Sequence, residues 1–162
     1  MTELVTGIAS IVAKAEGAAQ DWLDRYSLPL LRISMGAIIF GFGFLKYFPG
    51  ISPAEHMVLT VNHTLTFGLM PDRVTLPLFA TVECVIGLSL ITGWGLHVII
   101  YPMAIWAAGI LSPLVLMPAE LFSGRDHTPT LEGQYVLKDI ILLTATLVIA
   151  NGTIKRRALH VN

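Results

Sequence analysis

The sequence predicts an all-α integral membrane protein that crosses the bilayer as a four-helix bundle. Of its 162 residues, 54% are hydrophobic and only 13% are charged, and the mean hydropathy of +0.72 exceeds that of ordinary soluble domains. Four stretches are also apolar over roughly the 20 residues that a spanning helix needs. No shift in composition divides the chain, so residues 1–162 are expected to form a single membrane domain.

The four predicted spans are separated by short polar or turn-rich segments. They cover about residues 28–48, 74–91, 97–117 and 135–150. The second and fourth stretches are short for a hydrocarbon core about 30 Å thick, and their length would also suit core helices of a soluble bundle. The overall hydropathy and the scarcity of charge between the second and third stretches favour the membrane.

An amphipathic helix is expected before the first span, over residues 1–27. Apolar side chains recur there near the 3.6-residue period, and charged residues occupy the rest of the helical wheel. Trp22 and Tyr26 suit the headgroup level, where an aromatic ring meets both hydrocarbon and water. The pattern predicts a helix that lies in the membrane interface. A helix that packs on a partner subunit would explain it equally well.

A short extramembrane helix is expected between the first two spans. The run Ser52-Pro53-Ala54-Glu55 has the form of a capping box, with proline at the first helical position. Apolar residues then repeat at about one-turn spacing, so one face of this helix can lie on the membrane or across the mouth of the bundle. The helix is expected to end near Gly68.

The distribution of basic residues predicts that both termini face the cytoplasm. Lys155-Arg156-Arg157 follows the fourth span, and Lys14 and Arg25 precede the first. Lys46 and Lys138 on the opposite side weaken this contrast. The formal net charge is −1, and no basic run is interleaved with aromatic residues, so nucleic acid is not an expected partner. The start of the chain does not resemble a signal peptide, so the N-terminus is expected to be retained.

Five ionisable residues within or beside the spans are the candidate site residues: Arg32, Lys46, Glu83, Lys138 and Asp139. A charge in the hydrocarbon region is costly unless it finds a partner or faces water. We expect Lys46 and Lys138 to form an outer polar cluster with Asp139, and Arg32 to reach Glu83, the deepest of the five. Such groups can pair helices, bind a quinone carbonyl or relay a proton.

Small residues on two spans predict close helix packing. Gly36 and Gly43 recur two turns apart on the first span, and Ala104, Ala108 and Ser112 form a stripe on the third. Gly41-Phe42-Gly43 lies inside an apolar helix with no preceding strand, which indicates packing instead of a phosphate-binding loop.

Neither a metal site nor a covalent cofactor is expected. Cys84 is the only cysteine, which excludes a disulfide or a dithiol pair within one chain. His56 and His63 share a helix face but lie about 10 Å apart along it, too far to bind one ion unaided. His97 alone adjoins a span, whereas haem between helices usually needs two axial ligands.

Three runs in the spans resemble DoxX-like membrane proteins. Leu30-Leu31-Arg32-Ile33-Ser34-Met35-Gly36, continuing to Gly41-Phe42-Gly43-Phe44-Leu45-Lys46-Tyr47-Phe48, resembles the first helix of that family. Glu83-Cys84-Val85-Ile86-Gly87-Leu88 is similar to its second helix, and Pro129-Thr130-Leu131-Glu132-Gly133-Gln134-Tyr135-Val136-Leu137-Lys138-Asp139 to the start of its last. The resemblance implies a four-helix bundle of a bacterial or archaeal membrane, with relatives that include the small subunit of thiosulfate:quinone oxidoreductase.

These observations together lead to one functional expectation and one alternative. We expect an accessory or anchoring subunit of a quinone-linked redox complex in the bacterial cytoplasmic membrane, not catalytic by itself. Its expected partners are membrane lipid and other membrane subunits, and quinone or lipid is the expected ligand. The alternative is a non-catalytic structural or assembly protein that stabilises a larger complex. Thiosulfate chemistry is not carried over, because fold similarity does not transfer a reaction and a cysteine pair is lacking.

Overall fold

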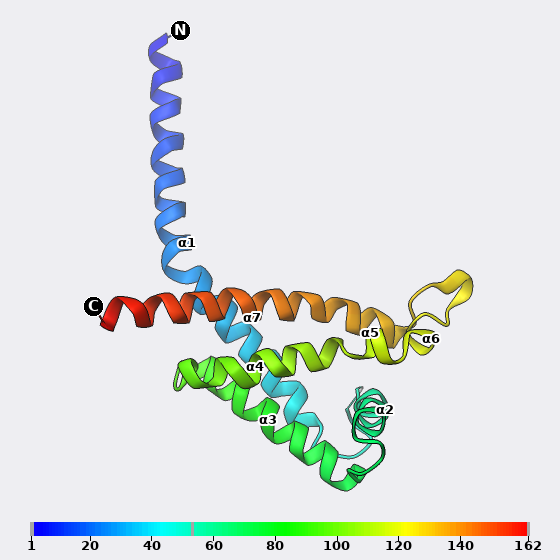
Figure 1. Ribbon diagram of the computed structural model, residues 1–162. Helices are drawn as coiled ribbons and strands as arrows, with labels where there is room; N and C mark the ends of the chain where they lie inside the picture. Colours follow the sequence, from blue (N-terminus) through cyan, green and yellow to red (C-terminus); the bar gives the residue numbers. More distant parts are fainter. Residues whose placement is uncertain (1, 53, 162) are drawn as a thin grey trace.

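The computed structural model describes residues 2–52 and 54–161, with side chains described from residue 11 to residue 155 except at 53. Over this part of the chain the secondary structure is helical, without strands (Figure 1). The α-helices are α1 (Thr2–Leu45), α2 (Glu55–Thr66), α3 (Asp72–Thr92), α4 (Leu96–Leu111), α5 (Pro113–Leu116), α6 (Pro118–Leu121) and α7 (Leu131–Val161), with a short 3-10 helix at Arg125–His127.

Four helical segments are long and apolar enough to cross a membrane. They are Ile11–Leu45, Asp72–Thr92, Leu96–Leu116 and Arg125–Lys155. The third segment joins α4 to α5, which begins at Pro113, a residue without a backbone N–H to continue the helical ladder. The predicted all-helical class with four candidate spans is therefore confirmed. The first and last helices extend well beyond the apolar stretches from which the spans were predicted.

The N-terminal segment and the first span form one continuous helix of 44 residues, α1. A separate interfacial helix over residues 1–27 was expected, but no residue between the two segments ends the helix. Pro29 lies inside α1, and the helix changes direction near this residue while its N-terminal part projects away from the other helices (Figure 1). All side chains from residue 11 to residue 27 are exposed. Their position in a membrane interface stays a prediction.

The long helices pack as two pairs, α1 on α3 and α4 on α7. A shared core joins the pairs, with buried residues from all four helices: Met35, Ile39, Ile86, Leu90, Ile100, Met103, Ala145 and Ile149. A Cβ atom built on Gly36 would lie 2.8 Å from the carbonyl oxygen of Gly87, and one on Gly43 would lie 2.7 Å from the Cβ of Glu83. These glycines therefore let α1 and α3 approach closely, which confirms the predicted packing role of Gly36 and Gly43.

The predicted small-residue stripe on the third span does not pack within this chain. Ala104 and Ala108 are exposed, whereas the buried residues of α4 are Ile100, Met103 and Ala107. The prediction of close packing at the stripe was wrong, because the larger apolar side chains on another face of α4 fill the space against the rest of the chain.

Helix α2 forms where a short helix was predicted, but its start differs. The N-cap position is Ala54, without a side-chain cap. Instead of completing a capping box, the Glu55 carboxylate accepts a 2.7 Å hydrogen bond from the backbone N–H of Gly50, and the buried Ser52 hydroxyl has no partner among the described residues. The helix ends at Phe67, whose φ of 53° is left-handed. Whether α2 lies outside the membrane stays a prediction.

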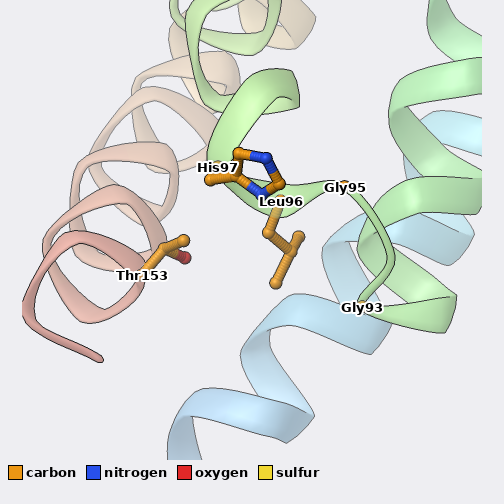
Figure 2. Close-up of a pocket in the computed structure, with 5 residues that line it drawn as sticks. All are labelled: Gly93, Gly95, Leu96, His97 and Thr153. Carbon is orange, nitrogen blue, oxygen red and sulfur yellow. The ribbon is translucent and has the colours of Figure 1, made fainter. Parts of the chain in front are cut away.

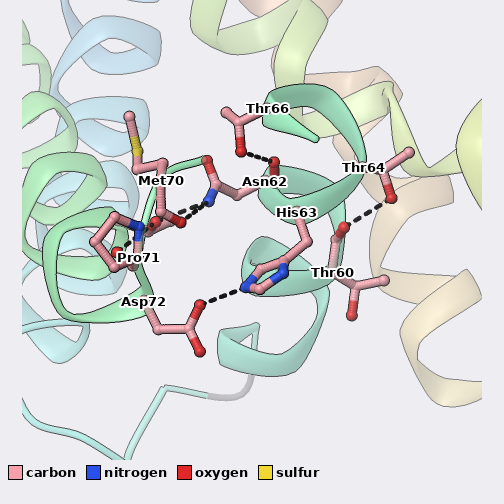
Figure 3. A network of polar contacts seen from close by, with 9 residues as sticks. Thr60, Asn62, His63, Thr64, Thr66, Met70, Pro71 and Asp72 are labelled. Atoms are coloured by element: carbon pink, nitrogen blue, oxygen red, sulfur yellow. Dashed lines mark hydrogen bonds and ion pairs between the residues drawn. The ribbon is translucent and has the colours of Figure 1, made fainter. Parts of the chain in front are cut away.

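Polar side chains hold α2 against the start of α3 (Figure 3). The buried Asn62 amide donates to the Met70 carbonyl at 3.2 Å and to the Thr75 hydroxyl at 2.8 Å. At the surface, His63 Nε2 lies 2.7 Å from a carboxylate oxygen of Asp72. The connection between the first two spans thus contains an ordered helix, and hydrogen bonds hold this helix in a defined position against α3.

Candidate functional site

Glu83 is the centre of a buried polar cluster between the long helices. Its Oε2 accepts a 2.5 Å hydrogen bond from the Lys46 ammonium, and its Oε1 accepts a 3.1 Å bond from the indole Nε1 of Trp106. The side chains of Lys46 and Glu83 are each only 5% exposed. Both carboxylate oxygens of Glu83 therefore have a partner within the protein.

The helix geometry explains why Lys46 meets Glu83. Gly43 brings the end of α1 against Glu83 on α3, and Lys46 follows in the turn directly after α1. Helix α3 begins at Asp72, about three helical turns before Glu83. The end of α1 thus lies beside the middle of α3, and Lys46 enters the protein at the depth of the carboxylate.

Asp139 on α7 is a charged neighbour of this cluster. This half-buried carboxyl lies within range of the charges of Lys46 and Glu83, but no hydrogen bond or ion pair joins it to either residue in the described part of the chain. We call Lys46, Glu83 and Trp106 the Glu83 cluster. Its members come from the end of α1, from α3 and from α4, so these three helices are connected by one buried polar site.

The structure corrects the pairing that was expected for Arg32. Arg32 forms no ion pair with Glu83; the side chain of Arg32 lies instead beside Gly93, just after the end of α3. The distance along α3 from Glu83 to Gly93 is about 15 Å at about 1.5 Å per residue, which is too long for one side chain to cover. Arg32 Nε is buried and has no hydrogen-bond partner among the described residues.

The expected outer cluster is also only partly present. Asp139 lies within range of the Lys46 charge without an ion pair between them, and Lys138 is exposed and places its ammonium 5.6 Å from the centre of the Tyr135 ring. Adjacent residues on a helix point in different directions, about 100° apart. When Asp139 faces the bundle, Lys138 therefore faces away from the cluster.

Trp106 is the cluster member that sequence reasoning missed. It lies within the third predicted span, where a tryptophan resembles any other large apolar residue. One signal was present, because the indole N–H of a buried tryptophan usually finds an acceptor. Glu83 was the deepest acceptor that the spans offered.

The cluster has two chemical capacities. The Lys46 ammonium compensates the charge of Glu83, and the Trp106 indole adds a neutral donor. These two bonds fix the relative positions of α1, α3 and α4. The Lys46 ammonium also carries three N–H donors, of which one is used by Glu83. Its other donors suit carbonyl or carboxylate oxygens.

Two cavities lie at the opposite end of the helices, where α3 ends and α4 begins. The larger has a volume of about 300 Å³ and is lined by Gly93, Gly95, Leu96, His97 and Thr153 (Figure 2). The smaller, about 80 Å³, shares Leu96 and Thr153 with it and is also lined by Arg32. The only predicted site residue that borders these cavities is therefore Arg32.

Comparison with known proteins found no similarity on which an assignment can rest. No protein family model matches the sequence, and no curated protein or solved structure is significantly similar to the chain.

Proposed function

We propose that this protein is an accessory or anchoring subunit of a larger assembly in the bacterial cytoplasmic membrane. The observation that carries the proposal is the projecting N-terminal part of α1, in which every described side chain before Leu28 is exposed. Trp22, Leu23 and Tyr26 are 52%, 46% and 42% exposed there. A helix whose described side chains are exposed to this extent gains stability when a partner or a lipid surface covers its apolar face.

The resemblance of the spans to DoxX-like proteins supports a quinone-linked redox complex as the assembly. Glu83, which the resemblance places on the second helix of that family, lies at the centre of the polar cluster. The Lys46 ammonium and the Trp106 indole N–H are the groups that would donate to a quinone carbonyl. Such a ligand would have to displace one of their bonds to Glu83.

A purely structural or assembly protein is the second candidate, and one observation favours it. Each oxygen of Glu83 is already bonded within the chain, as expected of a group that holds helices together. In this alternative the cluster binds no ligand, and the projecting helix alone determines the partner.

Purification of the tagged full-length chain from its native membrane in a mild detergent tests membership of an assembly. We expect specific polypeptides to co-elute, and quinone to accompany them. Trp22→Glu combined with Tyr26→Glu is expected to abolish co-elution while the helical content is retained. Asp21→Ala, on the polar side of the same helix, is the matched control. Unchanged co-elution of the double variant, or elution of the wild type alone, would contradict the proposal.

Glu83→Gln separates the two candidates once the partner polypeptides are known. Lost quinone-dependent turnover with intact assembly indicates participation in the redox reaction. Lost assembly, or intact assembly with full turnover, indicates that the cluster serves structure only.

A further inference from the structure

Two neighbouring cavities, which share Leu96 and Thr153 in their linings and are together called the pocket, lie beside a cation that has a buried donor without a partner in the described part of the chain. Arg32 borders the smaller cavity, and its guanidinium lies against Gly93, which borders the larger one. Arg32 Nε is buried and lacks an acceptor among the described residues. A buried guanidinium donor that is left unbonded costs free energy, and a bound anion would remove that cost.

The carbonyl groups at the end of α3 do not take the place of such an anion. The Ser89 carbonyl accepts from the Gly93 N–H at 2.8 Å, and the Trp94 carbonyl accepts from the Ser89 hydroxyl at 2.5 Å. No hydrogen bond from Arg32 to a carbonyl is present in the described part of the chain. The buried Nε–H of Arg32 is therefore available to another acceptor.

The first turn of α4 offers further donors to the same pocket. Its N-cap, Gly95, provides no side-chain cap. The backbone N–H groups of Leu96 and His97 have no backbone acceptor over the described residues. Both residues line the larger cavity, as Figure 2 shows for the loop from Gly93 to Leu96 with Thr153 of α7 opposite. Free N–H groups and the helix dipole favour an anion at such a position.

The lining of the pocket is suited to an anion that is attached to an apolar chain. The residues that line the two cavities include no carboxylate. Leu28, Leu96 and Ile149 form an apolar side of the smaller cavity next to Arg32. The C-terminal end of α3 and the N-terminal start of α4 also mark one boundary of the apolar spans, the level at which phospholipid headgroups lie. The larger cavity falls at the lower end of the range of small-molecule sites, about 300–1,000 Å³.

We propose that this pocket binds a phosphate group, which Arg32 and the first N–H groups of α4 contact together. The phosphate of an anionic phospholipid and free inorganic phosphate share this chemistry. The bidentate match between guanidinium and phosphate oxygens makes Arg32 the main determinant of affinity. The inference is independent of membership in a redox complex, because it concerns a ligand of the isolated chain.

Thermal unfolding of the full-length protein in a neutral maltoside detergent tests the proposal. Phosphatidylglycerol is added in one series, dioleoylglycerol, which has no phosphate, in a second and sodium phosphate in a third. A ligand that binds the folded state raises the Tm as its concentration increases. We expect phosphatidylglycerol to raise the Tm and dioleoylglycerol to have a much smaller effect. An equal rise with millimolar sodium phosphate would identify free phosphate as the ligand instead of the lipid.

Arg32→Gln is the decisive variant, and Lys138→Gln is its matched control. Each removes one positive charge, but Lys138 is exposed and lies far along α7 from Thr153. Arg32→Gln is expected to weaken the binding of phosphatidylglycerol about tenfold or more, because a charge-assisted hydrogen bond is lost. Lys138→Gln is expected to bind as the wild type does. Arg32→Lys keeps the charge without the planar donors, and we expect intermediate binding.

Three results would overturn the proposal. One is equal Tm shifts with phosphatidylglycerol in the wild type and in Arg32→Gln. Another is equal stabilisation of the wild type by phosphatidylglycerol and dioleoylglycerol, without an effect of phosphate. The third is equal weakening by Lys138→Gln, which would indicate attraction by net charge alone. If Arg32→Gln does not fold, the same comparison is made with Arg32→Lys, for which wild-type affinity would contradict the role of the guanidinium plane.

Discussion

At the scale of single residues, Glu83 has two different kinds of partner, a cation and a neutral indole donor. Removing one member of a buried ion pair leaves the other charge uncompensated, whereas removing both charges is often close to neutral. The pair with Lys46 should therefore respond in a strongly non-additive way to substitution.

Glu83→Gln is expected to lower the free energy of unfolding by about 3–5 kcal/mol, because the buried Lys46 ammonium loses its counterion. Combining it with Lys46→Met should restore a large part of that loss. Denaturant or thermal unfolding in detergent of the wild type, both single variants and the double variant measures the coupling. Additive effects of the two substitutions would show that the pair contributes no specific interaction.

Trp106→Phe is expected to destabilise the protein by about 1 kcal/mol, the usual net contribution of one hydrogen bond. The substitution removes the indole N–H that donates to Glu83 and keeps an aromatic ring in place. Trp94→Phe is the matched control, since Trp94 is 85% exposed. The two variants are compared by thermal unfolding, and equal losses would argue against the bond to Glu83.

Much of the candidate site was predictable from residue type, but its pairing was not. Lys46, Glu83 and Asp139 could be selected because charges in apolar spans need partners. Their partners depended on the relative positions of α1 and α3 along the helix axes, which a single sequence does not reveal. The contact of Gly43 with Glu83 reveals the actual stagger. The glycines that face each other are Gly36 and Gly87, and this register does not by itself identify Lys46 as the partner of Glu83.

At the scale of the helices, the contact between α1 and α3 depends on glycine at particular positions. A Cβ atom on Gly87 would lie 2.6 Å from the backbone nitrogen of Phe40, which cannot move aside without displacing α1. Gly41 on the same helix as Gly36 and Gly43 has nothing within 4 Å of the corresponding position. Gly87 is thus needed for the close contact between α1 and α3, whereas Gly41 is not.

Gly87→Ala is expected to destabilise the protein by about 1–3 kcal/mol, the usual cost of inserting a group into a filled contact. Gly41→Ala is expected to be neutral or stabilising by up to about 1 kcal/mol, since alanine favours helix. Unfolding of both variants in detergent gives the comparison. Equal stability of the two variants would show that the helices can separate without cost.

Helix positions followed from the sequence more readily than helix ends or helix faces. Apolar length alone located the four candidate spans, because the period of the pattern and the rise per residue are fixed. The unbroken course of α1 through Pro29 was not expected, since proline often ends a helix but also permits a bend. The outward position of Ala104 and Ala108 depends on the neighbouring helices, which a single sequence does not reveal.

At the scale of the whole molecule, large apolar side chains cover much of the outer surface of the described structure. Examples are Ile105 on α4, Val115 on α5, and Ile141 and Leu147 on α7, which are between 59% and 81% exposed. A surface of this kind is stable only when acyl chains, detergent or partner subunits cover it.

The orientation of the whole molecule is testable with a membrane-impermeant maleimide on a Cys84→Ala background. We expect Ser123→Cys, in the connection before α7, to be labelled from the outside of spheroplasts. Lys155→Cys should be labelled only after the membrane is permeabilised, because the basic C-terminal flank is predicted to remain in the cytoplasm. The reverse pattern would invert the assigned topology.

The continuity of α1 has a mechanical consequence. A protein that binds the projecting part of α1 before Pro29 would hold one part of a continuous helix. Lys46 follows directly after the other part. A change in the tilt of the part before Pro29 would alter the bend of the helix at this residue. It would thereby shift the Lys46 ammonium relative to Glu83. The binding of a partner outside the bundle would in this way be coupled, through one continuous helix, to the geometry of the Lys46–Glu83 ion pair.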